Sequence, residues 1–96
     1  MPLSETHRRH LRKLAHHLKP VVIVGNAGLT ENVLAEIDHA LAHHELIKVK
    51  INAADKTERQ AIIDKISEQT DAGWVLSIGH IAAFYRQAEK PKIVLP

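Results

Sequence analysis

The sequence predicts one small α/β domain whose segments alternate in the order α-β-α-β-α-β-β. Three segments place apolar residues three and four positions apart, as amphipathic helices do. Four other segments are short β-branched or alternating runs, mostly bounded by Pro, Gly or polar residues, as strands are. The 96 residues are 45% hydrophobic, which is enough for one core and too few for two. We therefore expect residues 1–96 to form a single two-layer domain with a four-stranded mixed sheet.

The first predicted helix begins after Ser4, a preferred N-cap, and ends at Pro20, which has no amide proton to continue it. Its buried face is predicted to consist of Leu11, Leu14, Ala15 and Leu18. Its exposed basic face is predicted to consist of Arg9, Arg12, Lys13 and His16, with Arg8 at its border. This basic face would be available to a partner.

The next segment predicts a strand, a glycine turn and a second helix. The β-branched run Val21–Val24 is typical of a strand that is buried on both faces. It leads into the turn Gly25-Asn26-Ala27-Gly28, after which Thr30 can cap a helix that ends near His43-His44. The core side of this helix is predicted to consist of Val33, Leu34, Ile37, Ala40 and Leu41.

The second half of the chain predicts a strand, a helix and a hairpin. Residues 46–51 alternate, with Leu46, Lys48 and Lys50 on one face and Ile47, Val49 and Ile51 on the other. Asp55 and Glu58 resemble a capping box that opens a helix with the buried stripe Ala61, Ile62 and Ile66. Gly73 closes this connection, and Gly79-His80 fits a tight turn between strands Trp74–Ile78 and Ile81–Tyr85. The three aromatic residues of this hairpin are expected to pack in the core.

Charge is distributed unevenly along the chain, although the net charge is only +2. Residues 1–28 contain one acid, Glu5, and the basic residues Arg8, Arg9, Arg12, Lys13 and Lys19. Residues 29–47 contain four acids and no Lys or Arg. We expect a positive side that would bind a polyanion, which Lys48 and Lys50 could extend if no helix covers their face.

The turn Gly25-Asn26-Ala27-Gly28 is the sharpest candidate site. A strand that ends in Gly-x-x-Gly before a capped helix directs free backbone N–H groups and a positive helix end toward one point, which suits a phosphate. KH domains clamp RNA with such a loop. The chain has neither Gly-x-Gly-x-x-Gly nor Gly-Lys-Ser/Thr, so dinucleotide and NTP binding are not expected.

Other classes of function lack the residues they need. With no cysteine, and with histidine pairs (His7 and His10, His39 and His43) that offer two ligands each, we expect no metal site. No nucleophile with a base and no pair of catalytic carboxylates is evident, so we expect no enzyme, cofactor or small-molecule substrate. The apolar runs are too short for a signal peptide or membrane span, which favours a cytoplasmic protein.

Several segments together resemble a known family, the CRM domain, and most closely its stand-alone bacterial YhbY members. They are Leu11–Pro20, Val21–Thr30, Glu45–Lys50, Val75–Gly79 and Phe84–Arg86, which cover nearly the whole chain. The resemblance implies an RNA-binding protein associated with the rRNA of large-ribosomal-subunit precursors, and a fold similar to the C-terminal domain of initiation factor three. It also implies that RNA contacts the loop 25–28 and the basic surface. Family loops often hold a basic residue between the glycines, where this chain has neutral Asn26 and Ala27.

Three alternatives remain open at this point. An Alba-like architectural protein would use a similar basic surface to bind DNA, and an adaptor would bind proteins through the acidic second helix. An RNA-modifying enzyme would need catalytic residues that we do not find. We expect the RNA-binding protein to be a monomer or to associate weakly. If His10, His16 and His17 lie beside phosphates, its affinity for RNA should fall as pH rises.

Overall fold

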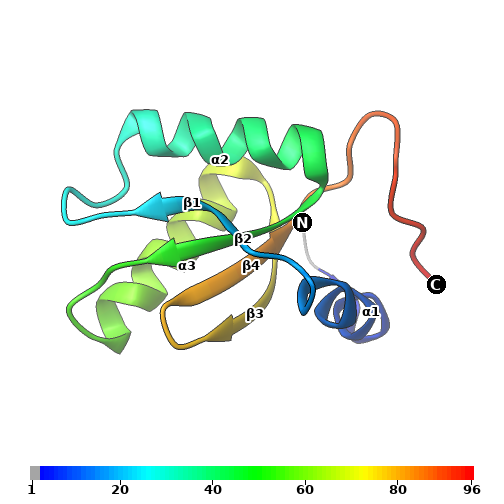
Figure 1. Ribbon diagram of the computed structural model, residues 1–96, viewed down its shortest axis with the longest axis horizontal. Coiled ribbons are helices and arrows are strands. Elements are labelled where there is room, and N and C mark those ends of the chain that lie inside the picture. Colours follow the sequence, from blue (N-terminus) through cyan, green and yellow to red (C-terminus); the bar gives the residue numbers. More distant parts are fainter. Residues whose placement is uncertain (1–2) are drawn as a thin grey trace.

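The computed structural model describes residues 3–96 and has the predicted order of helices and strands (Figure 1). The elements are α1 Glu5–Ala15, β1 Pro20–Val24, α2 Glu31–His44, β2 Leu46–Ile51, α3 Lys56–Thr70, β3 Gly73–Ile78 and β4 Ile81–Tyr85. No helix among the described residues is long and apolar enough to cross a membrane.

The four strands form one mixed sheet in the order β1-β2-β4-β3, which confirms the predicted sheet. Strands β1 and β2 are parallel, and β4 is antiparallel to both β2 and β3. The β3–β4 hairpin turns at Gly79, whose φ of +57° suits glycine at the first position of a two-residue turn. Because the strand order is β1-β2-β4-β3, strands β1 and β3 form the two edges of the sheet.

Helices lie on both faces of the sheet (Figure 1). Helices α2 and α3 cover one face, and the core between them and the sheet includes Ile37, Ile66 and the predicted inward residues of β2. Helix α1 packs on the opposite face over β2, β3 and β4, where Leu11 and Ala15 meet Leu46 and Tyr85. The sheet with α2 and α3 is thus the two-layer body, and α1 adds a partial cover on the other side.

Local capping explains where the helices begin. The side chains of Ser4, Thr30 and Asp55 accept hydrogen bonds from the backbone N–H three residues on, at 3.1, 3.2 and 2.8 Å. Each predicted N-cap is therefore confirmed. The Glu58 carboxylate accepts a hydrogen bond from the amide of Ala54 at 2.9 Å. The predicted capping box is therefore present, but this second bond comes from the residue before the N-cap Asp55 instead of from Asp55 itself.

The prediction that β1 is buried on both faces is wrong. Val22 and Val24 are buried against α2 and α3, whereas Val21 and Ile23 are 53% and 58% exposed. The reason is that β1 is an edge strand and α1 covers only the more distant strands of the other face. One half of that sheet face is therefore open beside β1.

Two predicted helix faces also need correction. Helix α1 ends at Ala15, so Leu18 lies in the following connection, and Leu14 and Leu18 are each 37% exposed rather than buried. In α3, Ala61 is exposed, and Ile63 instead joins Ile66 in the core. A shift of one or two positions on a helix rotates the buried stripe by more than half its width.

The chain after β4 is fastened to the end of α2 by a buried carboxylate. Glu45 is fully buried and accepts hydrogen bonds from the amides of Ala88, Lys92 and Ile93 at 2.8, 2.7 and 2.8 Å. Burial raises the pKa of Glu45, but these amide bonds and the charge of Lys92 outweigh it and hold the pKa below its ordinary value. The tail is therefore a fixed wall of the molecule at this end.

A second fastening lies at Arg86, directly after β4. Its Nη1 donates to the Asp38 carboxylate at 2.6 Å and to the Thr70 carbonyl at 2.9 Å, and its Nη2 donates to the Asp38 carbonyl at 3.1 Å. One guanidinium thus joins α2, the end of α3 and the strand exit. Asp38, an acid of the predicted negative side, is engaged within the fold.

Candidate nucleic-acid interface

The loop 25–28 is a tight turn that leads directly into α2. The Gly28 amide donates to the Gly25 carbonyl at 3.0 Å, which places Asn26 and Ala27 at the tip. Gly28 has φ +79°, in the left-handed region that favours glycine, whereas Gly25 does not. Within residues 3–96 the amides of Asn26 and Ala27 have no protein acceptor, so both are available to an outside ligand.

A shallow hollow lies beside the tip of this loop. Asn26, Asn52, Glu58 and His80 line it, so it joins the loop 25–28 to the start of α3 and to the hairpin turn. Lys50 of β2 lies two residues before Asn52 in the sequence, and it pairs in register with Ile23 of β1. At this end of the sheet, loop 25–28 is therefore accompanied by Lys50 and His80 and by the carboxylate of Glu58.

Helix α1 presents fewer free cations than predicted. Arg8 donates to the Trp74 carbonyl at 3.2 Å, stacks 5.5 Å from the centroid of the Trp74 ring and pairs with Glu5 at 3.1 Å. Arg12 donates to the Val75 carbonyl at 3.4 Å and pairs with the same Glu5 at 3.4 Å. Arg12, predicted on the exposed face, and Arg8, predicted at its border, are thus partly engaged within the fold, where they fasten α1 to β3.

Trp74 itself was expected in the core and is instead 38% exposed beneath Arg8. Its indole Nε1 donates to the Ser77 hydroxyl at 2.9 Å. Phe84 and Tyr85 are fully buried, and burial together with the Glu45 charge raises the pKa of Tyr85. Surface aromatic stacking at this hairpin is thus restricted to Trp74.

The other cations predicted to bind RNA lie on elements of the α1 side of the sheet. Arg9 and Lys13 are exposed on α1, Lys19 is exposed just before β1, and Lys50 is exposed on β2. None of these four side chains forms an ion pair with the described residues. Lys48 of β2 is half-buried, and its Nζ donates to the Leu18 carbonyl at 3.1 Å. We call Arg9, Lys13, Lys19, Lys48 and Lys50 the basic path.

The basic path follows the open half of the sheet from α1 to the loop 25–28. Lys48 and Lys50 share the sheet face of Leu46, which packs under α1. Within residues 3–96 no helix covers the part of that face next to Ile23, so the condition under which these lysines would extend the positive side is met. Figure 1 shows α1 near one end of β1 and the loop at the other.

A family model for the CRS1 / YhbY (CRM) domain matches residues 3–86. The chain belongs to this family. A Haemophilus influenzae relative named "RNA-binding protein" is 54% identical over 94 residues, which cover 98% of this chain and 95% of the relative. A Pseudomonas aeruginosa relative is 45% identical over 91 residues, covering 95% and 88%. The solution structure of a hypothetical protein from Staphylococcus aureus matches with a TM-score of 0.87 and 33% identity, covering 98% and 99%.

Three exposed acids of this CRM domain lie on α2, on the other side of the sheet. Glu31, Glu36 and Asp38 are exposed on α2, which covers the face opposite α1. Helix α3 carries both signs, with Lys56, Arg59 and Lys65 beside Glu58, Asp64 and Glu68. The excess of acids predicted for residues 29–47 therefore lies on α2, across the sheet from α1. Among the described residues no three His, Asp or Glu side chains are placed to share a metal ion.

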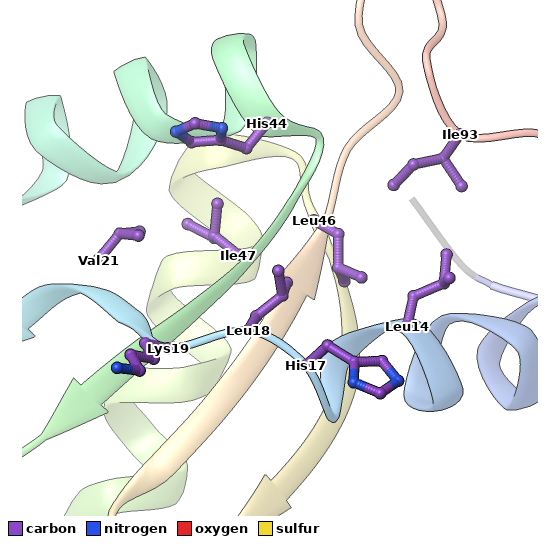
Figure 2. Close-up of a pocket in the computed structure, with 9 residues that line it drawn as sticks. All are labelled: Leu14, His17, Leu18, Lys19, Val21, His44, Leu46, Ile47 and Ile93. Atoms are coloured by element: carbon purple, nitrogen blue, oxygen red, sulfur yellow. The ribbon is translucent and has the colours of Figure 1, made fainter.

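Sequence reasoning missed a pocket at the start of β1 (Figure 2). It has a volume of about 550 Å³ and lies between the end of α1, the end of α2 and the tail. Leu14 and Leu18 were assigned to the core and instead line this pocket. The available signal was Pro20 between the apolar residues Leu18 and Val21, because a proline ends a helix and so separates the two side chains from one continuous buried stripe.

Proposed function

We propose that the chain, as a single CRM domain, binds RNA through the basic path and the loop 25–28. The observation that carries this proposal is the difference between the two sides of the sheet: the α1 side presents Arg9, Lys13, Lys19 and Lys50, which form no ion pair with the described residues, whereas α2 on the other side presents exposed acids. Phosphate contacts from Lys and Arg supply most of the sequence-independent affinity for nucleic acids. The name of the Haemophilus influenzae relative supports the choice of RNA.

Each part of the interface has its own role in this proposal. Arg9, Lys13, Lys19 and Lys50 bind backbone phosphates, while Arg8 and Arg12 share their charge with Glu5 and mainly hold α1 in place. The free amides of the loop tip donate to one further phosphate. Lys48 contributes through its charge, because its ammonium group is already bonded to the Leu18 carbonyl.

The proposed target is rRNA in precursors of the large ribosomal subunit, where the protein assists assembly without catalysing a reaction. Membership of the CRM family supports this target, since the sequence resemblance to YhbY proteins implies it. The stated geometry suits a folded RNA, because a path along one side of a small domain can follow phosphates across a groove.

Binding is tested by fluorescence anisotropy with a hairpin RNA that has a single-stranded loop of about ten nucleotides. Charge reversal of Arg9 and Lys13 to Glu should weaken binding strongly, because both side chains are exposed and unpaired. The matched control reverses Lys56 and Lys65 on α3 to Glu. Both are also exposed, but they lie on the α2–α3 side of the sheet, away from α1. Equal weakening by both double variants, or by neither, would refute the proposed face. Tighter binding to duplex DNA of the same length would favour an Alba-like role.

The target is tested by sedimentation of the tagged protein from cell lysate in a sucrose gradient at low and high salt. The proposal predicts salt-sensitive migration with large-subunit precursors, and sequencing of the RNA in the peak identifies the bound element. A protein that stays free of RNA at the top of the gradient in low salt would contradict it and favour a protein-binding adaptor.

A further inference from the structure

The pocket at the start of β1 is lined mainly by apolar side chains. Its floor and walls are the aliphatic side chains of Leu14, Leu18, Val21, Leu46, Ile47 and Ile93. Leu18 and Val21 remain 37% and 53% exposed there. Exposed clusters of apolar side chains in a hollow are typical of binding sites.

Cationic and aromatic groups stand at the rim of this apolar pocket. Figure 2 shows the imidazole rings of His17 and His44 on opposite sides, with Leu18, Leu46 and Ile47 between them. The exposed Lys19 lies at the same rim, directly before the first residue of β1. No Asp or Glu of residues 3–96 lines the pocket. The site thus combines an apolar interior with a rim that attracts anions.

We propose that this pocket receives one unstacked base of the bound RNA, with the adjoining phosphate at Lys19. The inference rests on the proposed function and adds to it the place where the protein contacts a base rather than the backbone. Proteins that bind single-stranded RNA take unstacked bases onto aromatic side chains, histidine included, and the backbone phosphate follows each base. The arrangement of His17, His44 and Lys19 matches both requirements.

The position of the pocket within the basic path supports a nucleotide over other apolar ligands. Lys13 precedes it on α1, and Lys19 and Lys48 follow it, so an RNA strand on this path passes its mouth. Strand β1 leads from Val21 at the pocket to Gly25 at the loop, a separation of about 13 Å at the usual rise of a strand. A strand held by its phosphates at the loop can therefore place a nearby base in the pocket.

The test compares two hairpin RNAs in the anisotropy assay, one with an ordinary loop of adenosines and one whose loop nucleotides carry no bases. We expect the wild-type protein to prefer the ordinary loop by about fivefold or more, the least that one stacked base contributes. Leu18→Gln and Val21→Gln keep charge unchanged and should abolish this preference while leaving the affinity for the abasic loop intact. The matched control is Val94→Gln, at an aliphatic residue that is 84% exposed outside the pocket.

The outcomes separate this inference from the proposed function. If neither hairpin binds the wild-type protein, the proposed function fails. If both bind equally, or if the Leu18→Gln and Val21→Gln proteins keep the preference, RNA binding stands and the base pocket is refuted. Amide chemical shifts during titration with adenosine monophosphate should move at Leu18 and Ile47; shifts there with octanoate alone would assign the pocket to an aliphatic ligand. A dimer in solution that Leu18→Gln disrupts would assign it to a second copy.

Discussion

Replacing Glu45 by Gln should destabilise the protein by releasing the tail from the end of α2. In the wild type, Oε1 accepts from the amides of Lys92 and Ile93 while Oε2 accepts from Ala88. A glutamine keeps one acceptor oxygen, so its amide group would place a donor against the Ala88 N–H. The two remaining bonds would lose the strength that the carboxylate charge gives them.

The magnitude follows from these three bonds. One buried donor without an acceptor costs about 1–3 kcal/mol, and the loss of charge assistance costs about 1 kcal/mol for each of the other two. If the tail detaches, its amides bond to water instead, which limits the total loss, so we expect the free energy of unfolding to fall by about 3 kcal/mol. In a protein of this size that change lowers Tm by about 12–24 °C.

Thermal unfolding followed by circular dichroism measures the loss, and hydrogen exchange locates it. The amides of Lys92 and Ile93 should lose protection in the Glu45→Gln protein, whereas amides of β2 and β4 keep theirs at low temperature. The control is Glu89→Gln, which neutralises an exposed carboxylate of the same tail. A loss below about 1 kcal/mol with both amides still protected would refute the reasoning.

Three further predictions concern pH, the loop 25–28 and salt. Because folding lowers the pKa of Glu45, its carboxylate stabilises the folded state above the unfolded pKa, and this stabilisation is lost as pH falls below about 4.5. The free energy of unfolding should therefore fall less steeply in acid for Glu45→Gln than for the wild type, as measured by urea unfolding at several pH values. Gly28→Ala should destabilise by about 1 kcal/mol, because φ is +79° while nothing lies within 4 Å of an added Cβ; an unchanged urea midpoint would contradict this. Lys13→Gln should reduce the slope of log affinity against log salt by about 0.7–0.9, and the same change at Lys65 should leave the slope unaltered.

The order of elements could be predicted from the sequence because its signals are local. Ser4, Thr30 and Asp55 cap helices through bonds to residues three positions away, and Gly79 sets a turn by its own conformation. The basic path could be predicted in outline for the same reason, since charge along one helix is visible in the sequence. Both the fold class and the family assignment were reached from such patterns and are confirmed.

The errors concern contacts between residues that are distant in the sequence. A β-branched run does not reveal whether its strand lies at the edge of a sheet, and the edge position of β1 follows only from the order β1-β2-β4-β3. Arg8 and Arg12 bond to carbonyls of β3, more than sixty residues away. Glu45 was counted among the acids of the predicted negative side, and its burial depends on amides more than forty residues later.

The central claim is that RNA binds on the α1 side of the sheet, and amide chemical shifts of the full protein during titration with the hairpin RNA test it most directly. The account predicts shifts at Lys13, Lys19, Lys50 and residues 25–28, and little change on the outer faces of α2 and α3. Shifts confined to the acidic face of α2, or no shift on the α1 side at low salt, would contradict it.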